Sequence, residues 1–286
     1  MLTLSKAATK RLFVLFSLVF LTSFNPIASV FKGTKDNYVL FFDLGDVLLE
    51  TNKSKAFFLT PWIFISNVLK HGAPSSVKIT QRLFELIDHQ TGHLPRGSAT
   101  ATCENIAVPQ MMCDWLTGAI SSADFVQIIT NINPKDPFFR SVQEGELLIN
   151  AAKLLLPDAL VKVNRPTRLL KVFNRCCKHD ASRVCILSNW DKSSLDLLKT
   201  QFPEIFAKIA DNQIFFSGSL GYKKPDADIF MCVADKIGAP LHRCVLIDDQ
   251  KTNVDGARRS GWKAVLHKST KMTAKILTDF YGFPCA

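Results

Sequence analysis

The chain lacks the features that mark several classes of protein. Its eight cysteines include no Cys-X-X-Cys pair, and the sequence has no internal repeat, no low-complexity tract and no arginine-rich or aromatic-interleaved stretch. Repeat arrays and dedicated nucleic-acid-binding segments are therefore not indicated, and we expect no nucleic-acid partner. The composition is otherwise ordinary: 286 residues, 47% hydrophobic and 21% charged, can bury one large core or one core plus a smaller unit.

Acidic residues are missing from the first 30 positions, which hold three basic residues and no acid. The basic residues precede an apolar run over residues 12–24, the order typical of a secretory signal. No clear cleavage site follows. We therefore expect residues 1–31 to be a signal peptide or, if uncleaved, a transmembrane anchor, because residues 12–31 approach the roughly 20 residues that a bilayer requires. Either outcome would place the rest of the chain outside the cytoplasm, exported or attached to the membrane.

The eight cysteines are not readily reconciled with an exported protein. An oxidising location would tend to pair cysteines. Cys185 and Cys244, however, lie in apolar runs and are expected to be buried free thiols. The group Cys176, Cys177 and His179 lacks the spacing of a metal site.

Of the net charge of +10, 7 units lie beyond the first 30 residues. This excess favours anionic ligands such as phosphates, although a solvated basic surface explains it equally well.

Four short apolar runs predict strands that are buried on both faces, at residues 38–42, 184–187, 214–216 and 244–247. Helical patterns lie between or after the later runs, at residues 193–202, 226–237 and 253–260. Strands that alternate with helices indicate an α/β fold with a doubly wound parallel sheet.

A long interval of about 140 residues separates the first two runs, which is far more than one crossover helix requires. Its patterns are helical, at residues 61–70, 80–89, 109–116, 122–129 and 142–155. We therefore predict a helical cap over residues 54–156, inserted into a core formed by residues 32–53 and 157–286.

Four polar motifs lie at or near the ends of the predicted strands: Asp43-Leu44-Gly45, Ser188-Asn189, Lys224-Pro225-Asp226 and Asp248-Asp249. Ligands of parallel sheets bind at the carboxyl ends of the strands, so these motifs are expected to face one crevice. Each motif taken singly is explained as well by a turn, a helix cap or a solvated charge. Their occurrence together favours a functional site.

In this order and spacing, the four motifs resemble the signature motifs of the haloacid dehalogenase (HAD) superfamily of hydrolases. The resemblance covers roughly residues 37–270 and is generic across the cap. Within the superfamily, the sequence looks most similar to a branch of small-molecule phosphatases that includes glucose-1-phosphate phosphatase. The resemblance implies a Rossmann-like core with an inserted helical cap.

The resemblance also implies a role for each motif. Asp43 would be the nucleophile that forms an aspartyl phosphate. Mg²⁺ would be held by Asp43, the backbone carbonyl of Gly45 and Asp249, with Asp248 bound directly or through water. The phosphoryl group would be bound by Ser188, the backbone N–H of Asn189 and Lys224, which directly precedes the proline as the lysine of the family does.

One position departs from the pattern. Most phosphatases of the superfamily carry a second aspartate two residues after the nucleophile, as the general acid and base, whereas this chain has Gly45. Losing such a group typically costs about 10²–10⁴-fold in rate. Three explanations remain open: Asp46 takes over the catalytic role, water or substrate suffices, or the enzyme is slow.

The resulting prediction is a Mg²⁺-dependent hydrolase of a small phosphate monoester. Two alternatives use the same fold: a hydrolase of carbon–halogen bonds, and a catalytically weak protein that binds a phosphorylated ligand. Neither the substrate nor the oligomeric state is indicated by the sequence.

Overall fold

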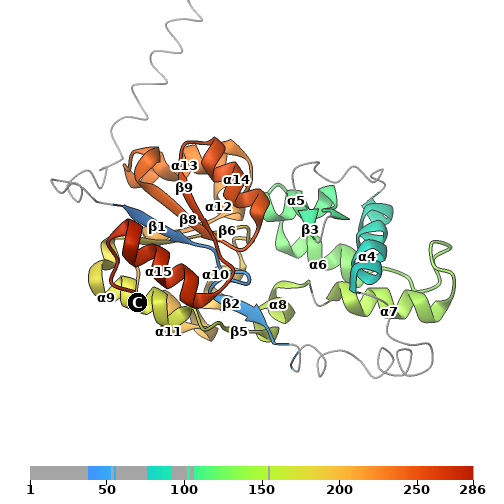
Figure 1. The fold of residues 1–286 in the computed structure, drawn as a ribbon. Coiled ribbons are helices and arrows are strands. Elements are labelled where there is room, and N and C mark those ends of the chain that lie inside the picture. The colour runs from blue at the N-terminus through green and yellow to red at the C-terminus, as the bar shows by residue number, and fades with distance from the viewer. Residues whose placement is uncertain are drawn as a thin grey trace, which may run out of the picture.

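The structure is a computed structural model that describes residues 38–52, 55, 76–91, 102–103, 106–153 and 155–285. The predicted leader over residues 1–31 and the predicted helix over residues 61–70 lie outside the described residues. Figure 1 shows a sheet-containing region, with helices on both sides of the sheet, and a helical region beside it.

A five-stranded parallel sheet forms the centre of the larger region, in the order β7-β6-β1-β8-β9. The strands are β1 (Val39–Phe42), β6 (Val184–Ser188), β7 (Ile214–Phe216), β8 (Cys244–Asp248) and β9 (Lys263–Leu266). Every residue of β1, β6 and β8 is buried, which explains why these strands are continuous apolar runs in the sequence. From β1, the chain adds strands first on one side and then on the other, so the strand order reverses at β1.

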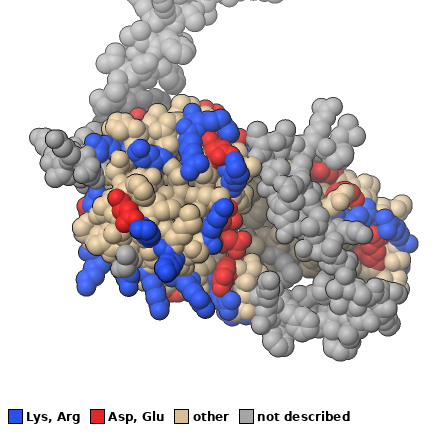
Figure 2. Space-filling model, in the orientation of Figure 1, with Lys and Arg blue, Asp and Glu red and all other residues tan. Residues whose placement is uncertain are grey.

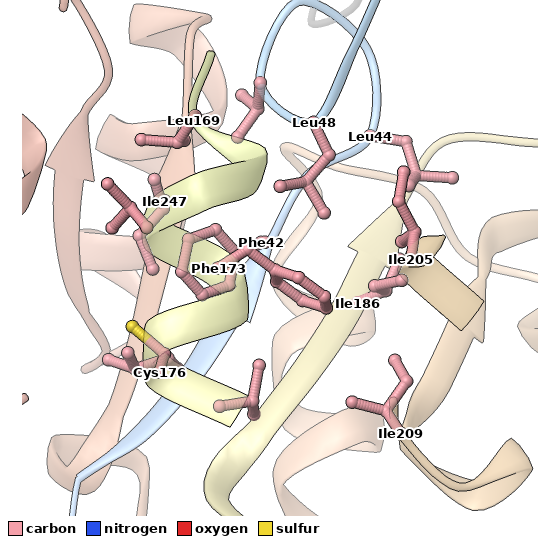
Figure 3. Close-up of a cluster of buried hydrophobic side chains, with 14 of the residues drawn as sticks. Phe42, Leu44, Leu48, Leu169, Phe173, Cys176, Ile186, Ile205, Ile209 and Ile247 are labelled. Carbon is pink, nitrogen blue, oxygen red and sulfur yellow. The ribbon is translucent and has the colours of Figure 1, made fainter. Parts of the chain in front are cut away.

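The two faces of the sheet bury alternate residues of the same strands. Phe42 and Ile186 pack with Phe173 into one cluster, shown in Figure 3, whereas Phe41 and Leu187 pack with Phe230 into the other. The first face is covered by α9 (Leu170–Asp180), α10 (Ser194–Gln201), α11 (Pro203–Phe206) and α15 (Thr270–Tyr281). The second is covered by α13 (Ala227–Ile237) and α14 (Lys251–Arg259). The sheet is therefore doubly wound, as the sequence predicts.

The helical region has an apolar cluster of its own. It contains α4 (Ser76–Thr91), α5 (Gln110–Thr117), α6 (Ser122–Thr130) and α7 (Val142–Lys153). Trp115 stacks on Phe125 with ring centroids 4.2 Å apart, and Leu86, Ile87 and Leu148 pack around them. After α7 comes α8 (Pro157–Val163), whose Val161 belongs instead to the cluster beneath the sheet.

Short elements complete the described chain. β2 (Leu49–Thr51) pairs antiparallel with β5 (Asn164–Pro166) at the point where the chain leaves and re-enters the sheet-containing region. β3 (Thr102–Cys103) and β4 (Ile106–Ala107) form a separate antiparallel pair. The four-residue α12 (Ser217–Leu220) follows β7, and three single 3₁₀ turns occur at Ala181–Arg183, Asp211–Gln213 and Leu241–Arg243.

The prediction of a transmembrane protein is contradicted. Across the described residues, no helix is both long enough and apolar enough to cross a bilayer. The longest described helix, α4, has 16 residues, whereas a span requires about 20. Residues 12–31, on which the prediction rested, lie outside the described part.

Charged side chains are spread over the visible surface of the sheet-containing region. In Figure 2, lysines and arginines cover several separate areas of this face, with acidic side chains between them. The excess of positive charge is thus distributed over this face.

Candidate active site

The carboxyl ends of β1, β6 and β8 bring the predicted motifs together. Asp43 directly follows β1, and its backbone N–H donates a hydrogen bond to the carbonyl of Ile247 (3.0 Å), so the residue continues the pairing with β8. Ser188 and Asp248 are the last residues of β6 and β8. The strand order reverses at β1, where open parallel sheets bind their ligands.

Asp43 is held through one carboxylate oxygen. Its Oδ1 accepts hydrogen bonds from the Ser188 hydroxyl (2.6 Å) and from the backbone N–H of Leu44 (2.8 Å), and it lies 3.0 Å from the Lys224 ammonium. Three contacts on one oxygen fix the orientation of a side chain that is almost completely buried.

Lys224 lies between two carboxylates. Its ammonium contacts Asp248 Oδ2 at 2.6 Å in addition to Asp43, and only 1% of the residue is exposed. Asp248 also accepts hydrogen bonds from the side-chain amide of Asn253 (3.1 Å to each oxygen) and the backbone N–H of Gln250 (2.8 Å). A buried ion pair is tolerated when its remaining hydrogen-bonding groups are satisfied in this way.

The surroundings raise the pKa of two of the carboxyl groups and of the lysine. Burial raises the pKa of Asp43 to about 6, against the lowering effect of Lys224, and Asp248 adds to the rise. Burial and the nearby Asp43 and Asp248 raise the pKa of Asp249 to about 7. Burial lowers the pKa of Lys224, but the two carboxylates outweigh it, so that pKa lies above its usual value.

Asp43, Asp248 and Asp249 form a group that fits a divalent cation. Each offers an oxygen, and these oxygens lie within 4.8 Å of one another. Asp249 Oδ1 is buried and has no hydrogen-bond partner. A cation among the three would satisfy that oxygen and remove the repulsion that raises the pKa of Asp249. Gly45, whose carbonyl was predicted as a further ligand, lines the same pocket.

Asp46 and Gly45 lie at the mouth of the pocket and are both exposed. Asp46 has a positive φ of 51°, which is uncommon for a residue other than glycine and tolerated best by Asp and Asn. Partial enclosure by its surroundings, together with Glu50, raises the pKa of Asp46 above its usual range. At Gly45, an added Cβ atom would meet no atom within 4 Å, so the space for a side chain exists there.

Asn189 has a contact that the sequence did not predict. Its side-chain amide donates to the carbonyl of Lys224 (2.8 Å), and its Oδ1 accepts from the backbone N–H of Lys224 (2.8 Å). The side chain thus fixes the backbone of the lysine, in addition to the phosphate-binding role predicted for its N–H. Sequence reasoning also missed the support of Asp248 by Gln250 and Asn253, both of which lie within five residues of it.

A pocket of about 230 Å³ opens above these residues. It is lined by Asp43, Ser188, Lys224 and Asp249 of the motifs. The rest of its lining combines apolar side chains with polar ones: Leu49, Trp115, Leu116, Leu160 and Trp190, and Asp46, Thr51, Asn164, Asn189, Gln250 and Asn253. Lys224 is the only lysine or arginine among the described lining residues. Among the residues that the structure describes, the pocket therefore combines acidic groups with one cation and no further positive charge.

The helical region meets the sheet-containing region beside this pocket. Ser217 Oγ donates to the carbonyl of Leu116 (2.5 Å), and Ser122 Oγ donates to Asp191 Oδ1 (2.9 Å). Gly118, with φ 77°, packs so closely that a Cβ there would lie 2.6 Å from the carbonyl oxygen of Gly218. These contacts hold Trp115 and Leu116 against the pocket.

Solved structures with a similar fold are known. The HAD family enzyme BT-2542 from Bacteroides thetaiotaomicron is similar over 82% of this chain and 95% of its own, with 18% sequence identity and a TM-score of 0.51. A mutant of that enzyme, in complex with magnesium and inorganic phosphate, is similar over 80% and 93%, with 18% identity and a TM-score of 0.50. The chain has a HAD-like hydrolase fold. The resemblance to the glucose-1-phosphate phosphatase branch stays a prediction.

Two sequence matches accompany this HAD-like fold. Residues 221–281, which contain Lys224, Asp248 and Asp249, match the family model described as HAD-hydrolase-like. The drimenol cyclase drtB of Aspergillus calidoustus is 33% identical over 119 residues, which cover 40% of this chain. The match spans only 22% of the length of that curated relative.

Proposed function

We propose that this chain is a Mg²⁺-dependent phosphatase of small phosphate monoesters, with Asp43 as the nucleophile. The observation that carries the proposal is the fixed Asp43 carboxylate, held by Ser188 and Lys224 next to two further carboxylates. Attack by Asp43 on phosphorus would form an aspartyl phosphate and release the alcohol, and water would then hydrolyse the aspartyl phosphate.

Each neighbouring residue has a task in this reaction. Lys224 compensates the charge of Asp43 and Asp248, so that a carboxylate can approach a phosphate dianion. The Ser188 hydroxyl orients the nucleophile and would bind a phosphoryl oxygen together with the N–H of Asn189. Asn189 also fixes the lysine backbone.

Mg²⁺ fits the group Asp43, Asp248 and Asp249, because hard oxygen ligands suit this ion and Asp249 Oδ1 has no protein partner. When bound, the ion would neutralise charge on the phosphoryl oxygens. The Bacteroides enzyme with the same fold binds magnesium and inorganic phosphate together, which supports this assignment.

The pocket indicates the kind of ester. About 230 Å³ is below the roughly 300–1,000 Å³ of typical ligand pockets, so the alcohol is small. The lining contributes three leucines and two tryptophans beside the polar Asp46, Thr51 and Gln250. The lining asparagines are already engaged: Asn164 with the carbonyl of Leu160, Asn189 with Lys224 and Asn253 with Asp248. We therefore propose an alcohol portion without a second anionic group and with more apolar surface than a sugar.

A comparison of substrates tests the proposal. Benzyl phosphate, a hexose monophosphate and a hexose bisphosphate are assayed for phosphate release with Mg²⁺ and with a chelator. We expect release only with Mg²⁺, and a kcat/KM at least about tenfold higher for benzyl phosphate, because one or two additional apolar contacts are worth this much. Equal kcat/KM values for the benzyl and hexose esters would refute the substrate class.

The Asp43→Asn variant tests the nucleophile separately. We expect the Mg²⁺-dependent release to fall by at least about 10³-fold, since the covalent step is removed. Unchanged release would refute the assignment of Asp43. Chloride release from a 2-chloro acid by the wild-type protein would favour the carbon–halogen alternative instead.

A further inference from the structure

The segment after α15 folds back onto α9 and is fixed there. Phe283 is fully buried, and its backbone N–H donates to the carbonyl of Leu277 (3.1 Å). The Arg175 guanidinium donates to the carbonyl of Cys285 (2.8 Å), and the N–H of Cys285 donates to Thr278 Oγ1 (3.0 Å). The backbone on both sides of Cys285 is therefore tied, once to α9 and once to α15.

These contacts bring Cys285 onto Cys176. The two sulfur atoms lie 2.9 Å apart, closer than two non-bonded sulfur atoms pack. Both residues are fully buried. Cys176 projects from α9 into the apolar cluster beneath the sheet, close to Phe173 and Ile247, as Figure 3 shows. α9 and α15 cover the same face of the sheet (Figure 1), so the pair joins α9 to the segment that follows α15.

We infer that Cys176 and Cys285 form an intrachain disulfide when the protein folds in the presence of a small disulfide oxidant such as oxidised glutathione. The backbone contacts hold the two sulfurs at almost bonding distance, whereas an S–S bond is about 2.05 Å long. Only a small approach of two side chains is required, and no helix has to move.

The reaction balances as two thiol–disulfide exchanges. The Cys285 thiolate attacks oxidised glutathione, forms a mixed disulfide and displaces one glutathione thiolate. The Cys176 thiolate then attacks Cys285 Sγ and displaces the second glutathione. Two protein thiols are oxidised by two electrons, and one oxidised glutathione becomes two reduced ones. Cys285 is the first nucleophile because it lies in the segment after α15, which is accessible to solvent until it docks, whereas Cys176 lies within α9.

Burial determines when the bond forms and how it behaves. A solvent-borne oxidant reaches Cys285 while the segment over residues 282–285 is still undocked, so the bond forms during folding. Once formed, it is enclosed by the apolar cluster and should resist reductants until the protein unfolds. Cys177, the neighbouring thiol, is a natural control because it lies next to Cys176 in the sequence, whereas it is the sulfur of Cys176 that lies 2.9 Å from that of Cys285.

Peptide mapping tests the inference on the full chain. The protein is refolded with a glutathione buffer, its free thiols are alkylated, and it is digested with trypsin without reduction. Cleavage after Arg175 and Lys178 releases Cys176 and Cys177 in one peptide, and cleavage after Lys275 releases the peptide with Cys285. We expect these two peptides to be linked. Full alkylation of Cys285 in the refolded wild-type protein would overturn the inference.

The Cys177→Ser variant resolves the two adjacent thiols. We expect the link to persist in this variant, since Cys176 alone remains in its peptide, and loss of the link there would overturn the assignment. The oxidised protein should also melt about 5 °C or more above the reduced protein, because the bond closes a loop of about 100 residues in the unfolded chain. This difference should be kept in Cys177→Ser and absent in Cys285→Ser.

Discussion

The two regions that meet at the pocket differ in what they bury. The sheet-containing region buries ionised groups at the carboxyl ends of its strands, with Lys224 between Asp43 and Asp248. The helical region buries apolar side chains around the stacked Trp115 and Phe125 and contributes Trp115 and Leu116 to the pocket wall. The sheet-containing region thus contributes buried charged groups, and the helical region contributes buried apolar side chains.

From this difference we expect the sheet-containing region to carry out the chemistry and the helical region to select the substrate. Buried ion pairs are seldom the most stable solution for a core, because apolar residues of the same volume often serve as well or better. Their presence at the strand ends therefore supports a functional role for the site. The helical region has no such cost among its described residues. It is expected to select substrates by shape and because its described lining residues carry no positive charge.

The strongest test of the charged region is Lys224→Met. Removing the cation leaves two buried carboxylates facing each other, so we expect a loss of about 3–5 kcal/mol in the free energy of unfolding. Phosphatase activity should fall by about 10³-fold, as for other groups that stabilise transition-state charge. Urea unfolding and kcat/KM measure the two effects.

Lys223→Met is the matched control. Lys223 is also buried, but it contacts the partly exposed Asp226 at 3.4 Å and does not contact the nucleophile in the described structure. We expect a much smaller loss of activity. Equal losses in the two variants would mean that the position of Lys224 between the carboxylates has no special importance.

The next largest expected effect is an increase in activity. Gly45→Asp places a carboxyl group where most phosphatases of the superfamily have their general acid, in a position where an added Cβ meets no atom within 4 Å. We expect kcat to rise by about 10²-fold for an alkyl phosphate, whose leaving group needs a proton, and much less for an aryl phosphate.

Two variants check the source of the gain. Gly45→Asn adds a side chain of the same size without an acid and should give no increase. Asp46→Asn removes the exposed neighbour, and a pH–rate profile unchanged from wild type would exclude Asp46 as the present acid. If Gly45→Asn accelerates the reaction as much as Gly45→Asp, the effect is steric.

Much of the sheet-containing region could be predicted from the sequence. β1, β6 and β8 are apolar at every position but the polar last residue of β6 and of β8, because helices cover both faces, and this pattern is visible without any structure. The site motifs could be predicted for the same reason, because a polar residue at the end of an apolar run is easily recognised in the sequence. β9 was missed because this edge strand begins at the exposed Lys263, so its sequence is not apolar from end to end.

The pocket wall could not be predicted. Leu49 and Leu160 lie far apart in the sequence and meet only because β2 pairs with β5. The side-chain contacts of Asn189 with Lys224 likewise depend on how two loops approach each other. Local patterns carry no information about such long-range contacts, so the proposed substrate class could not have been reached from the sequence. The boundaries of the inserted region and the catalytic roles stay predictions.

A smaller effect is expected at the junction of the regions. Gly118→Ala introduces a Cβ 2.6 Å from the carbonyl oxygen of Gly218, and backbone cannot yield as a flexible side chain would. We expect a loss of about 1–3 kcal/mol from the steric conflict, together with a fall of about tenfold in kcat/KM as Leu116 moves.

Gly238→Ala is the control for backbone conformation. Gly238 also ends a helix with a positive φ, of 67°, but has open space around it. It should lose only about 1 kcal/mol and keep full activity. Equal behaviour of the two variants would show that the close approach of Gly118 and Gly218 does not position the helical region.

The smallest effect concerns pH and Mg²⁺. Because burial raises the pKa of Asp43 to about 6 and that of Asp249 to about 7, the metal-free native state binds more protons than the unfolded chain between about pH 4 and 7. The contribution of these groups to stability therefore falls as the pH rises through this window. Mg²⁺ binds the ionised carboxylates, so its stabilising effect should increase in the same direction. We expect Mg²⁺ to raise Tm by a few degrees at pH 8 and by almost nothing at pH 5. An equal increase at both values would contradict the assignment, and Asp249→Asn should weaken the pH dependence.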